Sequence, residues 1–249
     1  MHATLTAKLK LLTTPEQAEQ LRRTALAYRA ALNYTSCTAF ANGKLANAIA
    51  LQKLVYRDLR AQFGLSAQLA CNVPRQVAAT YKGLWTKVQH NAEHRRKGFT
   101  KQRYKWLDKP PTYVALTTAF SYGYDYRFKT GQQISLTTLE GRLVLPYAGY
   151  TPHLAVIQVG RQFDEKQKAR KRQERKAQQE TTDEQEEQKH TQAIEQAMLT
   201  ASETMEEEPA KAEPEDVTFG AAKLWRDPRT KQWYLLVALA MPVPDVTPE

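Results

Sequence analysis

Patterns typical of β-strands lie at both ends of this 249-residue chain, and patterns typical of helices lie between them. Apolar side chains alternate with polar ones from Ala3 to Leu12, which predicts a half-buried strand. Two late segments, 221–226 and 232–241, flank a turn-forming stretch and predict a hairpin. We expect the first strand to share one sheet with the strands that follow the helical stretch. This order implies a barrel or curled sheet that carries a helical lobe.

Three helices are predicted in the first half of the chain, at about residues 15–43, 47–63 and 66–93. Thr14–Gln17 matches a capping box with proline at the first helical position, so the first helix begins directly after the first strand. Gly64 ends the second helix as a C′ residue. Pro74 is expected to interrupt and kink the third helix.

Short runs rich in Val, Ile, Leu, Thr and Tyr follow, and they predict strands at 113–118, 133–139, 142–146 and 153–159. Glu140-Gly141 lies between two of these runs and predicts a tight hairpin turn. The expected fold class is therefore α+β: a β-barrel with an inserted helical lobe and a long charged insertion, helical or disordered.

The expected divisions of the chain follow from this pattern. They are a first barrel strand at 1–12, a helical lobe with a basic loop at 13–109, barrel strands at 110–160, a charged insertion at 161–216, and a final hairpin with a Pro-rich tail at 217–249. Apolar residues are too sparse in the charged insertion to cover a core.

Charge is spread unevenly along the chain. Residues 1–160 contain 22 Lys and Arg against 7 Asp and Glu, whereas residues 161–216 contain 10 against 16. The first part is therefore far more basic than the net charge of +10 indicates, which favours a polyanionic partner. No apolar run approaches the roughly 20 residues of a membrane-spanning helix, and we expect a cytoplasmic protein without a membrane partner.

The segment LQKLVYRDLR, residues 51–60, divides at helical pitch into two faces. Leu51, Leu54, Val55, Leu59 and Phe63 recur at core spacing, while the opposite side gathers one aromatic ring and three cations: Lys53, Tyr56, Arg57 and Arg60. Such a surface suits a phosphate backbone, because each neutralised phosphate releases counterions. An ordinary solvated amphipathic helix explains the same pattern.

A second basic segment, 94–109, contains seven Lys and Arg interleaved with Phe99, Tyr104 and Trp106. Aromatic rings offer flat surfaces to bases while the cations follow the backbone, so this segment also predicts nucleic-acid binding. The alternative is a basic loop whose aromatic side chains tuck into the core.

A third cluster lies at the start of the charged insertion and could form an RNA-binding arm or a solvated charged helix. Its residues are Lys166, Lys168, Arg170, Lys171, Arg172, Arg175 and Lys176.

No catalytic constellation or metal site is predicted. The acids of residues 1–160 are few and mostly in caps, turns or helix surfaces, which does not match a two-metal nuclease. Cys37 and Cys71 lack zinc-site spacing, and we interpret them as small buried residues. His90 and His94 are four residues apart, but the adjacent basic run favours contact with nucleic acid or solvent over a metal.

Four separated motifs, in this order, resemble the N-terminal half of TnpB/OrfB proteins, the transposon-associated RNA-guided nucleases related to type V CRISPR effectors. They are KLKLLTTPEQAEQLRRT, LQKLVYRDLRAQFGLSAQLA, ISLTTLEGRLVLPYAG and WYLLVALAMP. The resemblance covers residues 5–160 and 217–241. It implies a wedge-type, oligonucleotide-binding-like barrel with a helical recognition lobe, which together hold a guide-type RNA and double-stranded DNA with its adjacent motif.

The resemblance places the 51–60 helix, Gln52 included, against nucleic acid. Together with the basic face of the third helix and the basic segment, it gives the expected contacts: Gln52, Lys53, Tyr56, Arg57, Arg60, Arg75, Lys82, Lys87, Arg95, Arg96, Lys97, Lys101, Arg103, Tyr104 and Lys105.

The chain departs from the family because the RuvC-like nuclease and the zinc-ribbon cysteines do not follow the last strand. The resemblance therefore implies a non-catalytic recognition module without a cofactor, since Mg²⁺ would belong to the nuclease part. One alternative is the first piece of an RNA-guided endonuclease whose RuvC part lies on a separate or interrupted chain. Another is a basic scaffold that binds proteins.

Overall fold

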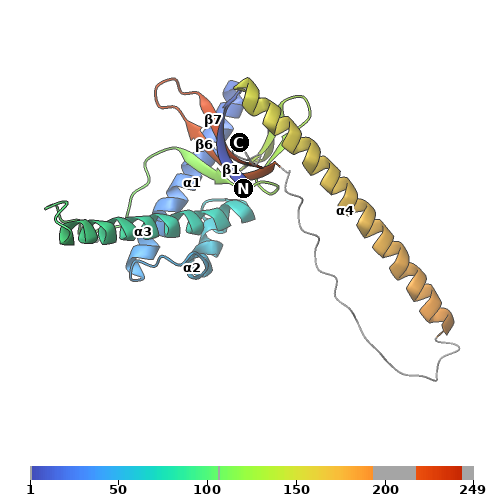
Figure 1. Ribbon diagram of the computed structural model, residues 1–249, viewed down its shortest axis with the longest axis horizontal. Helices are drawn as coiled ribbons and strands as arrows, with labels where there is room; N and C mark the ends of the chain where they lie inside the picture. The colour runs from blue at the N-terminus through green and yellow to red at the C-terminus, as the bar shows by residue number, and fades with distance from the viewer. Residues whose placement is uncertain (1, 106, 193–216, 243–249) are drawn as a thin grey trace, which may run out of the picture.

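The computed structural model describes residues 2–105, 107–192 and 217–242, without the side chains of residues 2, 175–192 and 242. Figure 1 shows a strongly curved sheet with helices beside it and a long helix that projects from the body. The helices are α1 (Pro15–Ala41), α2 (Ala48–Ala61), α3 (Ala67–Arg96) and α4 (Thr151–Gln192). The strands are β1 (His2–Leu11), β2 (Thr117–Phe120), β3 (Tyr126–Lys129), β4 (Gln133–Thr138), β5 (Gly141–Gly149), β6 (Thr218–Arg226) and β7 (Trp233–Pro242).

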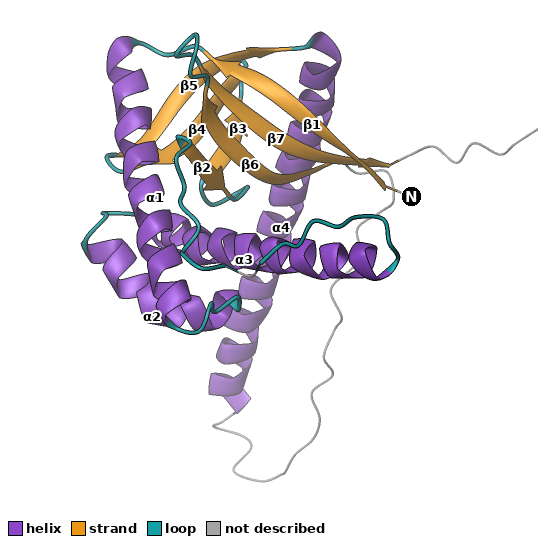
Figure 2. Cartoon of the chain, turned by 90° about the vertical axis from the view of Figure 1, so that its left-hand side faces the viewer, coloured by secondary structure: helices purple, strands orange, loops and turns teal. Residues whose placement is uncertain are grey.

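The seven described strands form one antiparallel, nearly closed, barrel-like sheet in the order β2-β6-β7-β1-β5-β4-β3 (Figure 2). β1 pairs with β7 from His2↔Pro242 to Lys10↔Tyr234, so the first strand of the chain is joined to the last one described. The inward positions of β1 and β7 are buried, whereas Lys8 and Lys10 are exposed. The predicted alternation of the first strand is therefore confirmed, and so is the mixed α+β class with a barrel-like sheet.

The helices α1, α2 and α3 share their core with the sheet. Two buried tyrosines fasten α1 to α3: the Tyr28 hydroxyl donates to the Gln76 amide oxygen at 3.2 Å, and the Tyr81 hydroxyl donates to the Ser36 carbonyl at 2.8 Å. α2 lies largely on the side of α3 that faces away from the sheet (Figures 1 and 2). The capping box at Thr14 is present as predicted.

Two expectations for these elements are wrong. α3 runs without a break across Pro74, which is buried inside the helix instead of interrupting it. Residues 113–116 are not a strand, because the backbone of Tyr113 is hydrogen-bonded to α1, and β2 starts only at Thr117. The pattern also missed β3, which is only four residues long.

The strand expected at 153–159 is also wrong, because these residues form the first turns of α4. Pro152 lies in the first turn of this helix, as Pro15 does in α1. Leu154 and Ile157 recur at helical spacing and face the barrel. A short apolar run fits a helix and a strand equally well, and the tertiary contacts decide. The expected charged insertion thus starts inside a helix that continues to Gln192; its residues 193–216 lie outside the described residues.

Candidate nucleic-acid interface

The exposed side of α2 carries three cations. Leu51, Val55 and Leu59 are fully buried, and their spacing turns Lys53, Arg57 and Arg60 to solvent. We call these three residues the α2 basic face. Asn47 starts the helix by accepting hydrogen bonds from the amides of Ile49 and Ala50.

The single acid of α2 is turned away from these cations. Asp58 accepts a hydrogen bond from the Tyr34 hydroxyl at 2.6 Å, and this bond raises the pKa of Tyr34. The carboxylate is therefore held against α1. Among the described residues, no carboxylate forms an ion pair with the α2 basic face.

Three other residues of α2 lie differently from the expectation. Gln52 donates to the Cys71 sulfur at 3.3 Å, so its amide faces α3. The ring of Tyr56 is half-buried against the core. Leu54, expected in the core, is 51% exposed because the buried stripe is centred on Val55 and leaves Leu54 on its flank. The basic face is therefore narrower than the sequence indicated.

The basic loop, which we define as residues 97–109, is fixed to α3 by one buried asparagine. The Asn91 amide donates to the Gln102 carbonyl at 2.9 Å, and its oxygen accepts from the Tyr104 amide at 2.8 Å. This pairing reproduces the hydrogen bonds of a neighbouring strand. It holds Arg103, Tyr104 and Lys105 along the helix with their side chains exposed.

A second asparagine fixes the segment that follows the loop. Asn33 of α1 accepts from the Tyr113 amide at 2.7 Å and donates to the Tyr113 carbonyl at 3.1 Å. Ser36 donates to the Pro111 carbonyl at 2.7 Å, and Arg29 donates to the Val114 carbonyl at 3.0 Å. Sequence analysis missed Asn33 and Asn91, because a lone asparagine inside a helix gives no sign of a distant backbone partner.

Three cations surround a notch where α3 meets the basic loop. Arg95, Arg96 and Lys101 line it together with Ala92 and Thr100, and its volume is about 520 Å³. We call these three residues the loop notch. Positive side chains are favourable in the last turn of a helix, so part of this arrangement serves α3 itself.

Two of the three aromatic residues of the basic segment are exposed in the structure. Phe99 is 75% exposed and lies edge-on to His94, and Tyr104 is 48% exposed. Both rings are therefore accessible for stacking and do not tuck into the core. Trp106 lies outside the described residues. Lys97 is exposed beside the loop notch at the end of α3.

The remaining cations of α3 occupy other positions. Arg75 lines a groove of about 600 Å³ between α3 and the barrel, where Lys223 of β6 also contributes. Lys82 is exposed on the same side of α3, nearly two turns later. Lys87 is exposed but lies on another side of the helix. The structure thus distributes the expected contacts over several surfaces instead of one.

Sequence analysis missed a basic and aromatic patch on the outside of the barrel. The Lys8 ammonium lies 4.3 Å from the centre of the Tyr234 ring and 5.5 Å from that of Trp225. Trp225 and Tyr234 are opposite each other in the β6–β7 pairing. The sequence placed Lys8 and Lys10 on the polar side of β1, but only the strand order brings the rings beside them.

The expected RNA arm lies on α4, away from these surfaces (Figure 1). Arg170 forms a 2.8 Å ion pair with Glu174 one turn later, and Lys168 pairs with Asp164 at the same distance. Lys171 and Arg172 are exposed. The side chains of Arg175 and Lys176 lie outside the described residues.

The candidate contact residues differ from other cations of the chain in having no ion-pair partner among the described residues. Within the described residues, the α2 basic face, the loop notch, and Arg75, Lys82, Lys87, Lys97, Arg103 and Lys105 have no carboxylate within salt-bridge distance. By contrast, Arg22 pairs with Glu19 and Arg23 with Glu140 on α1. Unpaired cations on a folded surface are available to an external polyanion.

Neither the protein-family models nor the curated proteins compared with this chain match it. In the described parts of the chain, no three His, Cys, Asp or Glu side chains are grouped so that they could hold a metal ion. None of the described helices has the length and apolar character needed to cross a membrane.

Proposed function

We propose that this chain binds nucleic acid as a recognition module of TnpB type, with a guide-type RNA and double-stranded DNA as partners and no cofactor of its own. The observation that carries the proposal is the set of unpaired, exposed cations on α2, on α3 and in the basic loop. Cations that are free of internal carboxylates contribute to phosphate binding through counterion release. Hydrolysis, if it accompanies binding, belongs to a separate RuvC-bearing chain.

The order of the elements supports this proposal. α1, α2 and α3 come between β1 and β2 in the chain, as a helical recognition lobe inserted in a wedge-type barrel would. α4 comes between β5 and β6, in the place of the charged insertion. The position of α1, α2 and α3 agrees with the resemblance, whose motifs lie in β1 and α1, in α2 and α3, in β4 and β5, and in β7. The resemblance does not cover residues 161–216.

The separation of the basic surfaces also supports two nucleic-acid partners. Gln52 of α2 contacts Cys71 near the start of α3, whereas the loop notch begins at Ala92. At 1.5 Å per residue these positions are roughly 30 Å apart along the helix. Surfaces this far apart can contact two nucleic-acid partners, or two segments of one RNA, at the same time.

The test is RNA binding measured by fluorescence anisotropy at low salt. Replacing Arg57 and Arg60 by alanine should weaken binding roughly 3- to 30-fold, with little dependence on RNA sequence. The matched control replaces Arg22 and Arg23, which removes the same charge from a helix but from arginines that are already paired with Glu19 and Glu140. The control should bind RNA nearly as well as the unchanged chain.

Two outcomes contradict the proposal. The first is RNA binding no stronger than that of an acidic protein of similar size. The second is an equal loss in both variants, because net charge alone would then explain the effect. Protein partners without RNA in a nuclease-treated pull-down would favour the scaffold alternative.

A further inference from the structure

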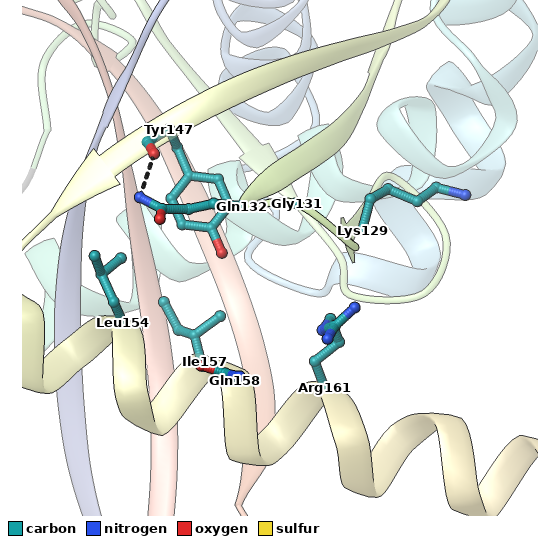
Figure 3. A pocket seen from close by; sticks show the side chains of 8 residues that line it. All are labelled: Lys129, Gly131, Gln132, Tyr147, Leu154, Ile157, Gln158 and Arg161. Atoms are coloured by element: carbon teal, nitrogen blue, oxygen red, sulfur yellow. Dashed lines mark hydrogen bonds between the residues drawn. The ribbon is translucent and has the colours of Figure 1, made fainter.

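A pocket of about 430 Å³ lies between the β3–β4 turn, β5 and the first turns of α4. Figure 3 shows Tyr147 and Arg161 on opposite sides of this space, on β5 and on α4 respectively. Its volume falls in the range typical of small-molecule sites. The α2 basic face and the loop notch contribute no residue to it, so it is a separate place on the molecule.

The upper wall of the pocket is held in place by a pair of hydrogen bonds. The Gln132 side-chain amide donates to the Tyr147 carbonyl at 2.8 Å, and the Tyr147 amide donates to the Gln132 carbonyl at 3.2 Å. Gly131 and Gln132 both have positive φ, which turns the chain sharply between β3 and β4. The Tyr147 ring packs against Phe128, with ring centres 5.6 Å apart. The wall is therefore fixed before any ligand binds.

The charge of the pocket is positive. The Arg161 side chain is only 19% exposed, and its guanidinium extends toward the β3–β4 turn (Figure 3). Among the described residues its carboxylate partner is the exposed Glu165, at 3.4 Å, and this single contact leaves other guanidinium donors available. Lys129 lies at the rim with its ammonium pointing outward, and no acidic residue lines the pocket.

The Tyr147 hydroxyl adds a neutral donor to this charge. The hydroxyl projects toward α4 in Figure 3. Burial raises the pKa of Tyr147, and the nearby Arg161 opposes that rise. The phenol therefore stays protonated at neutral pH, so it can donate a hydrogen bond to an anion beside Arg161.

The rest of the lining is apolar. Leu154 and Ile157 of α4 face the pocket, and Ile157 is 1% exposed. The half-buried Leu154 offers an apolar contact to the body of a ligand, with the buried Ile157 and Tyr147 beside it. A ligand suited to this pocket therefore has an anionic end and a compact body.

We infer that this pocket binds the phosphate monoester of a single nucleotide, with the phosphate between Arg161 and the Tyr147 hydroxyl and the nucleoside against Leu154 and Ile157. A phosphate monoester presents several oxygens to a guanidinium and a hydroxyl at once, which a phosphodiester within a strand does less well in so small a space. The nucleotide can be free or can be the phosphorylated end of an RNA strand. Only the second case rests on the proposed function.

Calorimetric titration with AMP and with adenosine tests the free form. AMP should bind, and adenosine should bind about tenfold or more weakly, because it lacks the phosphate. Arg161→Gln should remove the difference between the two ligands. Arg127→Gln, which changes an exposed arginine of β3 outside the pocket, should leave it intact. Tyr147→Phe keeps the ring packing and removes only the hydroxyl, so it tests the site if Arg161→Gln fails to fold.

A second arm compares short RNAs that carry a 5′-phosphate or a 5′-hydroxyl. Tighter binding of the phosphorylated RNA that Arg161→Gln abolishes assigns the pocket to RNA ends. In that variant the 5′-hydroxyl RNA should still bind through the basic surfaces, so loss of the pocket and loss of the proposed function are distinguishable. The inference is overturned if neither AMP nor the 5′-phosphate gives a preference, or if Arg161→Gln leaves the preference unchanged.

Discussion

Asp125 shows how one buried carboxylate can join a helix to the edges of the barrel. It is 1% exposed, and one of its oxygens accepts hydrogen bonds from the Ser121 amide and the Asn72 side chain, each at 2.9 Å. Asn72 also donates to the Ala119 carbonyl. Burial raises the pKa of Asp125, although these two hydrogen bonds and Arg142 oppose the rise.

We predict that Asp125→Ala lowers the free energy of unfolding by about 1–3 kcal/mol, because it leaves the buried Ser121 amide without an acceptor. Asp125→Asn should cost less, since both donors point to one oxygen that an amide can supply. Denaturant unfolding of the unchanged protein, Asp125→Ala and Asp125→Asn at neutral pH measures the three unfolding free energies. If both variants are equally stable, loss of these hydrogen bonds does not explain the loss of stability.

The same residue predicts a dependence on pH. Because the folded-state pKa of Asp125 is raised, the folded protein binds this proton more readily than the unfolded chain. The contribution of Asp125 to stability should therefore increase as the pH falls through its folded-state pKa toward the unfolded value. The difference in unfolding free energy between the native protein and Asp125→Asn, followed from neutral to acidic pH, checks the sign.

Two helical glycines have opposite predicted responses to alanine. A Cβ on Gly160 would lie 2.8 Å from the ring of Phe219, which itself packs against Tyr122 and Phe128 and cannot easily move. Gly160→Ala should therefore destabilise the protein by about 1–3 kcal/mol. Gly83 has nothing within 4 Å, so Gly83→Ala should stabilise α3 by about 0.5–1 kcal/mol. Thermal unfolding measures the melting temperature of both variants. Shifts of the same sign would contradict the prediction.

At the scale of elements, asparagine side chains of α1 and α3 hold the loop segments that lie between α3 and β2. Asn33 pairs with the backbone of Tyr113 and holds it against α1, and Asn91 pairs with the backbone of Gln102 and Tyr104 and holds it against α3. Cations on such a segment bind phosphate with less loss of conformational entropy than cations on a free loop.

Asn91→Ala should therefore weaken RNA binding by several-fold although it removes no charge, because the basic loop is no longer held along α3. Gln89→Ala, an exposed change two residues away in the same helix, is the matched control. Anisotropy measures affinity, and hydrogen exchange at Gln102 and Tyr104 should report faster exchange of the Tyr104 amide in Asn91→Ala alone. Unchanged exchange would show that the pairing does not hold the loop.

For the whole molecule, the distance between the α2 basic face and the loop notch predicts independent contributions to binding. The free-energy losses from Arg57→Ala with Arg60→Ala and from Arg95→Ala with Arg96→Ala should add in the combined variant. Each lost phosphate contact should also reduce the slope of log affinity against log salt by roughly 0.7 for single-stranded RNA. Anisotropy titrations over a salt series measure both quantities. If the binding free energy lost in the combined variant is well below the sum of the separate losses, the two surfaces do not contribute independently.

Much of the fold followed from local pattern. The alternation in β1, the capping box at Thr14 and the last hairpin are formed by neighbouring residues, so the linear order of side chains specifies them. The hairpin between β4 and β5 was also predicted, but its turn lies at Leu139-Glu140, one residue before the expected Glu140-Gly141. The α2 cations were also predictable, because helical pitch alone turns them away from Leu51, Val55 and Leu59.

Other features depend on contacts between residues far apart in the chain, and no local pattern contains them. The run at 153–159 becomes helical because Leu154 and Ile157 pack on a barrel that is completed by β6 and β7, more than 60 residues later. Asn91 binds the basic loop, and Lys8 meets Trp225 and Tyr234, only after the chain has folded. Local order of polar and apolar residues fixes each element and its charge, whereas packing across the molecule fixes which charges share a surface.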